Sequence, residues 1–170
     1  MHTHQTHTAH IRLVCNEDSH AIASIYNHYI RHSTATFDTD TVSENDMAER
    51  IRDISARYPY LVYEEQGRVL GYCFSHSWKP RKAYSQTVET TVYVHPDCAR
   101  RGIGELLMRA LIEECKIRGF HVLIACITAD NEASISLHEK LGFTRVSLFK
   151  EVGMKFGKTL DVTDYELILN

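Results

Sequence analysis

The chain has 170 residues, of which 44% are hydrophobic and 24% are charged, and its formal net charge at neutral pH is −3. This length suits one domain with a full hydrophobic core, and the composition is typical of a soluble globular protein. The slightly negative charge gives no reason to expect nucleic acid as a partner. No apolar run approaches the roughly 20 residues that span a bilayer, so no membrane partner is expected.

Cysteine usage indicates a reducing compartment. The five cysteines are odd in number, form no Cys-x-x-Cys pair and lie mostly in apolar runs. Reduced structural thiols have this distribution. Because no secretory signal is visible either, we expect a cytoplasmic protein.

The N-terminus is rich in histidine and carries His2, His4, His7 and His10. A transition-metal site is one interpretation of this run. Carboxylate or cysteine partners at metal-site spacing are missing nearby, however. We therefore expect a disordered polar tail over residues 1–10 and no metal.

The rest of the chain shows no repeat and no domain boundary, and its apolar pattern predicts alternating strands and helices. The expected order is βααβββαβαββ, a mixed α/β layer fold. In chain order we expect a strand over 11–15, a helix ending near residue 32, a helix capped by Ser43, a hairpin of strands 60–64 and 68–75, a strand over 87–95, a helix over 102–118, a strand over 121–128, a helix over 131–141, and two strands over 143–149 and 164–169.

Two of these elements should form the core. The strand over 121–128 is almost entirely apolar, so we expect it to be central and covered on both faces. The helix over 102–118 is amphipathic. Its predicted inner face consists of Ile103, Leu106, Leu107, Ala110 and Leu111.

The segment that joins this helix to the preceding strand resembles a phosphate cradle. A β-type run ends at His95, a polar turn follows, and Gly102 and Gly104 precede the helix. Glycine permits a tight turn and a close ligand approach, and the N–H groups at a helix start suit a diphosphate. Arg100 or Arg101 can add positive charge. An ordinary loop with glycines at a helix start is the alternative, which the flanking strand and helix make less favourable.

Two other nucleotide motifs are excluded at this position. A Walker loop needs a lysine and a hydroxyl after its second glycine, where this chain has Glu105 and Leu106. A dinucleotide fingerprint needs a third glycine, and Leu107 occupies that place.

A carboxylate stands in the middle of the strand before the cradle. Strand alternation places Glu89, Thr91 and Tyr93 on one face. Strands disfavour acidic residues, so Glu89 is either a solvated or ion-paired residue or a functional base. A base beside a phosphate cradle indicates group transfer from a nucleotide-bearing donor.

Two further groups of residues have both a structural and a functional interpretation. Lys79 and Arg81, together with Tyr84, lie just before that strand and can clamp a small anion or form a solvated basic loop. Asn131 can cap a helix or contact a ligand. His138 follows it two turns later, where an isolated histidine is more often structural than catalytic.

Taken together, these segments resemble the GNAT superfamily of acetyl-CoA-dependent N-acetyltransferases. The run from Val92 to Leu111 and the run from Asn131 to Phe143 carry the resemblance. Within the superfamily the chain is most similar to phosphinothricin N-acetyltransferases, through matching stretches at 26–30, 57–59 and 78–94. The similarity extends over about residues 11–169.

The resemblance implies a single acetyltransferase domain over 11–170 with a split, V-shaped central β-sheet flanked by helices. Pantetheine would occupy the gap between the strand that ends near His95 and the strand that starts near His121. It also implies a homodimer. Acetyl-CoA contacts are assigned to Val92, Tyr93, Val94, Arg100, Arg101, Gly102, Ile103, Gly104, Glu105 and Asn131.

The same match assigns the roles of the acceptor side. Glu89 becomes the general base, and His138 and Tyr93 become candidates for donating a proton to the leaving thiolate. Substrate contacts are assigned to Phe37, Lys79, Arg81, Tyr84, Thr91 and Tyr93. A cysteine acyl-enzyme at Cys98 is the weaker mechanism, because nothing marks that thiol as activated.

The expected reaction is direct acetyl transfer to the α-amine of phosphinothricin or a related small amino acid. Three departures from the family pattern bear on specificity: Ala99, Thr128 and the segment 158–160, which lacks the usual tryptophan. Methionine sulfoximine or sulfone, another amino acid, a polyamine and a protein N-terminus remain alternative acceptors. A non-catalytic acyl-CoA sensor and a plain interaction scaffold are the readings from other classes.

Overall fold

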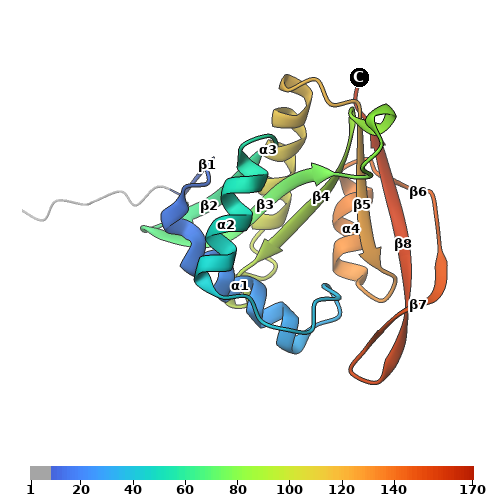
Figure 1. The fold of residues 1–170 in the computed structure, drawn as a ribbon, viewed down its shortest axis with the longest axis horizontal. Helices are drawn as coiled ribbons and strands as arrows, with labels where there is room; N and C mark the ends of the chain where they lie inside the picture. Colours follow the sequence, from blue (N-terminus) through green and yellow to red (C-terminus); the bar gives the residue numbers. More distant parts are fainter. Residues whose placement is uncertain (1–8) are drawn as a thin grey trace, which may run out of the picture.

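The computed structural model describes residues 9–170, so most of the expected histidine-rich tail lies outside the described residues. One mixed sheet of eight strands forms the centre, and helices cover both of its faces (Figure 1). Within residues 9–170 no helix is long and apolar enough to cross a membrane. The helices are α1 (Ser19–His32), α2 (Glu44–Ser55), α3 (Ile103–Ile117) and α4 (Glu132–Lys140), with short 3₁₀ turns at Asn16–Asp18, Lys82–Tyr84 and Pro96–Cys98.

The strand order is β1-β2-β3-β4-β5-β8-β6, with β7 paired to the other part of β8. Neighbouring strands are antiparallel except β4 and β5, which are parallel. The strands are β1 (His10–Leu13), β2 (Tyr60–Glu65), β3 (Arg68–Ser77), β4 (Thr87–Val94), β5 (Val122–Thr128), β6 (Thr144–Arg145), β7 (Phe149–Lys155) and β8 (Lys158–Ile168).

The parallel pair divides the sheet. β4 and β5 are paired only where Thr87–Glu89 faces Val122–Ile124. Beyond Glu89 the two strands separate, and Figure 1 shows them adjacent at the top of the view and diverging below. The split, V-shaped sheet expected from the sequence is therefore confirmed.

Each face of the sheet carries its own core. The buried apolar residues of α1 and α2 pack against β2 and β3. The buried face of α3 packs against the other side of the sheet, together with the apolar residues of β5. β5 is bonded to β4 on one edge and to β8 on the other, which confirms its predicted central place. The β2–β4 arm is thus covered by α1 and α2 on one face and by α3 on the other.

Three details of the sequence interpretation were wrong. His10, expected in the disordered tail, is the first residue of β1 and pairs with Glu64. Leu106 is about half exposed, and Met108 is fully buried in its place on the inner face of α3. The C-terminal region forms three strands rather than two, because Phe149–Lys155 and Lys158–Ile168 make a hairpin that turns at Gly157. The first of these strands has a register shift between Phe149 and Gly153, which breaks the regular alternation that sequence analysis relies on.

Candidate active site

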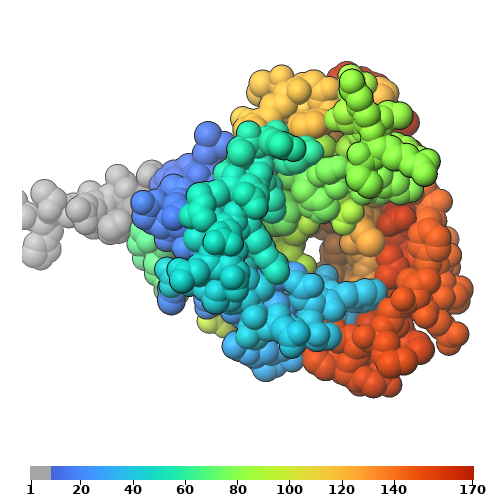
Figure 2. All heavy atoms as spheres, in the orientation of Figure 1, coloured from blue at the N-terminus to red at the C-terminus, as the bar shows by residue number. Residues whose placement is uncertain are grey.

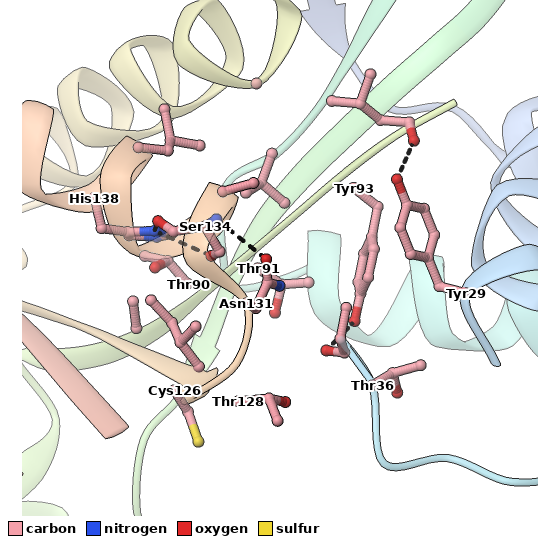
Figure 3. Close-up of a pocket in the computed structure, with 18 of the residues that line it drawn as sticks. Tyr29, Thr36, Thr90, Thr91, Tyr93, Cys126, Thr128, Asn131, Ser134 and His138 are labelled. Atoms are coloured by element: carbon pink, nitrogen blue, oxygen red, sulfur yellow. Dashed lines mark hydrogen bonds between the residues drawn. The ribbon is translucent and has the colours of Figure 1, made fainter. Parts of the chain in front are cut away.

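A cavity of about 750 Å³ occupies the gap between β4 and β5. The loop after α1, the glycine loop before α3 and the start of α4 complete its lining (Figure 3). Figure 2 shows the cavity as an opening between the helical half of the molecule and the β8 half. The sequence-predicted site residues that line it are Phe37, Glu89, Thr91, Val92, Tyr93, Val94, Arg100, Gly102, Ile103, Gly104, Glu105, Asn131 and His138.

The β4 side of the cavity presents backbone groups. The N–H of His95 bonds to the carbonyl of Leu70 on β3, so strand alternation turns the N–H groups of Val92 and Val94 toward the gap. The pairing of β3 with β4 runs without a register shift. These N–H groups face the gap because β4 leaves β5, and no bulge is needed.

The glycine loop supplies the start of a helix. Gly102 has a φ of 78° and directly precedes Ile103, the first residue of α3. Helical hydrogen bonding begins with the N–H of Leu106, which bonds to the carbonyl of Gly102. The N–H groups of Ile103, Gly104 and Glu105 precede that bond, as at any helix start. The geometry suits a diphosphate at the helix N-terminus.

The two arginines of this loop differ in position. Arg100 lines the cavity and adopts a φ of 63°, which is uncommon for a residue with a side chain. The guanidinium of Arg101 makes two hydrogen bonds, of 2.8 and 2.7 Å, to the carboxylate of Glu65 and is outside the lining. Arg100 is thus the better placed of the two for a phosphate, and the assignment of Arg101 stays a prediction.

Glu89 lies at the point where the sheet divides, partly buried and facing the cavity. Burial raises the pKa of its carboxyl group. The ring of His76, whose Nε2 is 3.9 Å from Oε1, opposes this shift, and the carboxylate of Asp164 adds to it. A raised pKa improves a carboxylate as a proton acceptor near neutral pH.

Two tyrosines lie across the cavity from α4 (Figure 3). The hydroxyl of Tyr93 donates to the carbonyl of Ala35 at 3.3 Å, and burial raises its pKa, so it stays protonated. The hydroxyl of Tyr29 donates to the carbonyl of Val94 at 2.6 Å. Sequence reasoning missed Tyr29 as a site residue, because a tyrosine on the inner face of a helix has the pattern of a core residue.

His138 and Asn131 line the α4 side. His138 is 3% exposed, and its Nδ1 lies 2.7 Å from the carbonyl of Ser134. A carbonyl only accepts, so Nδ1 holds the ring proton, and burial lowers the pKa of the imidazole. The neutral ring therefore presents Nε2 without a proton. Asn131 caps α4 by accepting the N–H of Ser134 at 3.2 Å.

The loop that follows α1 closes the cavity and is hydrogen-bonded to β5 and β7, on the other side of the gap. Nζ of Lys155 on β7 is buried and donates to the carbonyls of Ser33 and Thr36 at 2.8 and 2.7 Å. The hydroxyl of Thr128 on β5 donates to the carbonyl of Thr34 at 2.6 Å. Figure 2 shows this loop meeting the C-terminal hairpin below the opening.

The ring of Phe37 depends on this arrangement. A side chain at Gly153 on β7 would place its Cβ 2.2 Å from Cε2 of Phe37, so the ring needs a glycine there. Sequence reasoning missed Gly153 and Lys155 as site residues. A lysine and a glycine in a mixed polar segment carry no signal of a contact with a loop more than 100 positions earlier.

The cluster of basic and aromatic residues before β4 lies outside the cavity. Lys79, Arg81 and Tyr84 are outside the cavity lining, and both cations are exposed. Nζ of Lys79 lies 4.0 Å from the centre of the Trp78 ring, which also meets Tyr84 edge to face at 5.1 Å. This cluster is ordered by its own contacts, and its substrate role stays a prediction.

Comparison with known proteins decides what this site is. The model of the acetyltransferase (GNAT) domain matches residues 11–163. The chain belongs to the GNAT acetyltransferase family. It is 41% identical to the L-amino acid N-acyltransferase MnaT of Escherichia coli, over 94% of each chain. It is 36% identical to a phosphinothricin N-acetyltransferase of Alcaligenes faecalis, over 94% of this chain and 82% of the other.

A solved relative agrees with this assignment. The structure of the Salmonella typhimurium acetyltransferase yncA with acetyl-CoA superimposes with a TM-score of 0.94 at 38% identity, covering 96% of this chain and 95% of that one. The protein is therefore an N-acetyltransferase that uses acetyl-CoA. The N–H groups of Val92 and Val94 that face the gap suit pantetheine amides. The helix start at Gly102 suits the diphosphate. Acetyl-CoA supplies the acetyl thioester, and the protein residues supply position and proton transfer.

The two hydrogen bonds from Lys155 to the carbonyls of Ser33 and Thr36 form a lysine bridge, and its role can be tested. Lys155→Met removes both hydrogen bonds to the loop of residues 33–37. We call this segment the acceptor loop because Phe37 is a predicted substrate contact, and it should become more mobile in the variant. We expect KM for the acceptor to rise at least about tenfold, since bonds to a charged donor contribute about 1.5–3 kcal/mol each. KM for acetyl-CoA should change little. Steady-state kinetics with each co-substrate varied in turn measure both constants.

Lys150→Met is the matched control. Lys150 lies on the same strand, is exposed and pairs with Asp161 away from the loop. An equal rise of both KM values in Lys155→Met, or the same change in both variants, would show that the lysine does not act through the acceptor loop.

Proposed function

We propose that the enzyme acetylates the α-amine of phosphinothricin or a related small amino acid by direct transfer from acetyl-CoA. The observation that carries this proposal is the position of Glu89, which faces the cavity at the point where β4 leaves β5. The relatives support the acceptor class, since one is named for L-amino acids and another for phosphinothricin. A cytoplasmic setting fits the five cysteines, all of which are free thiols.

Deprotonation of the amine is the first requirement. An aliphatic amine with a pKa of about 10.4 is neutral in only about one molecule in a thousand at pH 7.4. Glu89 accepts the proton, directly or through a water molecule, and burial raises its pKa for that task. The neutral amine then attacks the thioester carbonyl without an acyl-enzyme.

The other residues act on the carbonyl and on the leaving group. The N–H groups of Val92 and Val94 face the gap and are placed to polarise the carbonyl oxygen. A thiol has a pKa near 8.5, so the leaving thiolate needs only mild assistance. Tyr93 is the better placed donor, because its hydroxyl lies at the cavity wall while neutral His138 holds its proton on Nδ1, against the carbonyl of Ser134.

Other acceptors remain the alternative within this activity. Methionine sulfoximine or sulfone, other amino acids, polyamines and protein N-termini all present an amine. The cations Lys79 and Arg81 favour an anionic amino acid over a polyamine. The non-catalytic sensor and the scaffold are set aside, because the relatives reported above are acyltransferases.

Removal of the base tests the mechanism. Glu89→Gln should lower kcat by about 10² to 10⁴ and leave acetyl-CoA affinity close to the native value. In the native enzyme, activity should fall with decreasing pH as the carboxylate takes a proton, at a higher pH than for an exposed glutamate. Product formation by mass spectrometry and acetyl-CoA titration calorimetry measure the two effects. Glu166→Gln, a mid-strand carboxylate on β8 outside the lining, is the control.

Acceptor choice is tested with a panel of amines that includes phosphinothricin, methionine sulfone, neutral amino acids, a polyamine and a peptide N-terminus. We expect the anionic amino-acid analogues to give the highest kcat/KM. Arg81→Ala should then raise KM for these anions far more than KM for acetyl-CoA, with the neighbouring Lys82→Ala as control. Equal effects on both co-substrates would remove Arg81 from the acceptor site.

We also propose a homodimer built on an apolar patch near the C-terminus. Monomers rarely expose a large contiguous apolar surface. Val152, Met154 and Phe156 alternate along the chain with Gly153 and Lys155, which contact the loop of residues 33–37, so a partner there would stiffen that loop. Its residues are between 46% and 72% exposed, and they are Val146, Leu148, Phe149, Val152, Met154 and Phe156.

Charge within the patch should dissociate the dimer. We expect a dimeric mass for the native chain and a monomeric mass for Val152→Glu combined with Met154→Glu, measured by sedimentation velocity. Ile117→Glu, at an exposed apolar position on α3, should stay dimeric. A native chain that sediments as a monomer would refute the proposed assembly.

A further inference from the structure

The reaction releases one proton that must leave the site. The acceptor enters as an ammonium group with three N–H bonds, and the amide product keeps one of them. When the C–S bond breaks and the C–N bond forms, the leaving thiolate takes a second proton and becomes a thiol. The third proton goes to the solvent. A base that accepts this proton must lose it again before the next turnover.

His76 lies between the proposed base and the solvent. It is directly opposite Glu89 in the pairing of β3 with β4. Its Nε2 is 3.9 Å from Oε1 of Glu89, and the side chains are 37% and 29% exposed respectively. Glu89 lines the cavity, whereas His76 does not. The order from the inside outward is therefore cavity, carboxylate, imidazole and solvent.

The ring of His76 is oriented to receive a proton. Its Nδ1 lies 2.9 Å from the carbonyl of Ser77, which can only accept a hydrogen bond. In the neutral ring the proton is therefore on Nδ1, and the lone pair of Nε2 faces the carboxyl group. A neutral imidazole can accept a proton at its bare ring nitrogen and then release it to buffer, so this side chain is suited to relaying a proton.

The other ionisable groups around Glu89 are unsuited to this step. Asp164 on β8 is a like charge that raises the pKa of Glu89, and it accepts the hydroxyl of Ser147 at 3.0 Å. Desolvation of the Cys126 sulfur on β5, together with the carboxylates of Glu89 and Asp164, raises the pKa of this thiol to about 12, so it stays protonated. Among the described residues, His76 is the one basic side chain within ion-pair distance of this carboxylate.

We propose that His76 is the proton outlet of the active site, a positioning residue that acts through Glu89. Protonated Glu89 passes its proton to Nε2 of His76, directly or across one bridging water, and becomes a carboxylate again. The imidazolium then loses that proton to solvent water or buffer. The proposal rests on the proposed role of Glu89 as the base.

The test compares His76→Ala and His76→Gln with the native enzyme, using L-methionine sulfone as acceptor, or phosphinothricin if it is the better substrate. We expect kcat to fall by at least about tenfold in both variants. Imidazole added to His76→Ala should restore part of the lost rate. The acid limb of kcat/KM should move to higher pH, because the pKa of Glu89 rises once the neighbouring imidazolium is gone.

His20→Ala is the matched control, since His20 pairs with a carboxylate, Glu44, at 3.1 Å on the surface of α1. It should leave kcat and the pH profile unchanged. Amide product is counted by mass spectrometry, so uncatalysed thiol release does not contribute. Melting temperatures of all variants identify any loss of folding.

The possible results separate the two proposals. Native kcat and an unmoved pH profile in both His76 variants, beside an inactive Glu89→Gln, would overturn the outlet and leave the base in place. Near-native turnover of Glu89→Gln would refute both the role of Glu89 as the base and the role of His76 as the proton outlet. A lower kcat in His76→Ala without imidazole rescue, and with an unmoved acid limb, would show that the ring is only structural and would also overturn the outlet.

Discussion

The active site depends on the early parting of β4 and β5. A strand edge inside a protein carries N–H and C=O groups that cost about 1–3 kcal/mol each when they are left without a partner and without water. β4 leaves such an edge beyond Glu89, where it separates from β5. The cavity keeps the edge wet, and an extended molecule with amide groups can replace the water. An interrupted sheet of this kind is suited to an extended ligand whose amide groups continue the missing pairing.

The same interruption explains the electrostatics. A carboxylate inside a continuous sheet would need an ion pair, and one on the outer surface would have an ordinary acidity. Glu89 is the last residue of β4 that is paired with β5, and the cavity begins there. Burial raises its pKa, while the facing imidazole limits the shift. Burial also raises the pKa of Tyr93 and keeps its hydroxyl protonated, so the cavity wall holds both groups that the proposed mechanism uses for proton transfer.

Local patterns were enough to predict most of the framework. Ser43 caps α2 as expected and accepts the N–H of Asp46, and the run at 121–128 forms the central strand because its residues are apolar on both faces. The glycine loop and the carboxylate of Glu89 were identified because their spacing reflects local backbone geometry. These features depend on neighbours within a few positions.

The contacts that sequence reasoning missed join distant segments. The bonds of Lys155 to residues 33 and 36, and the place of Phe37 over Gly153, depend on how the C-terminal hairpin bends. The irregular register of β7 hides that hairpin from any alternation rule. The salt bridge of Arg101 with Glu65 was missed for the same reason, since a hairpin turn far from the glycine loop supplies the carboxylate.

The lysine bridge has a consequence for how such an enzyme can change. In the proposed site, acetyl-CoA meets main-chain groups of β4 and α3, whose geometry depends little on side-chain identity. The loop proposed to contact the acceptor is joined to the C-terminal hairpin by the ammonium group of Lys155. Substitutions in the hairpin can therefore re-aim the loop while the main-chain groups of β4 and α3 stay intact. Acceptor specificity can therefore change during evolution while the binding of the coenzyme is retained.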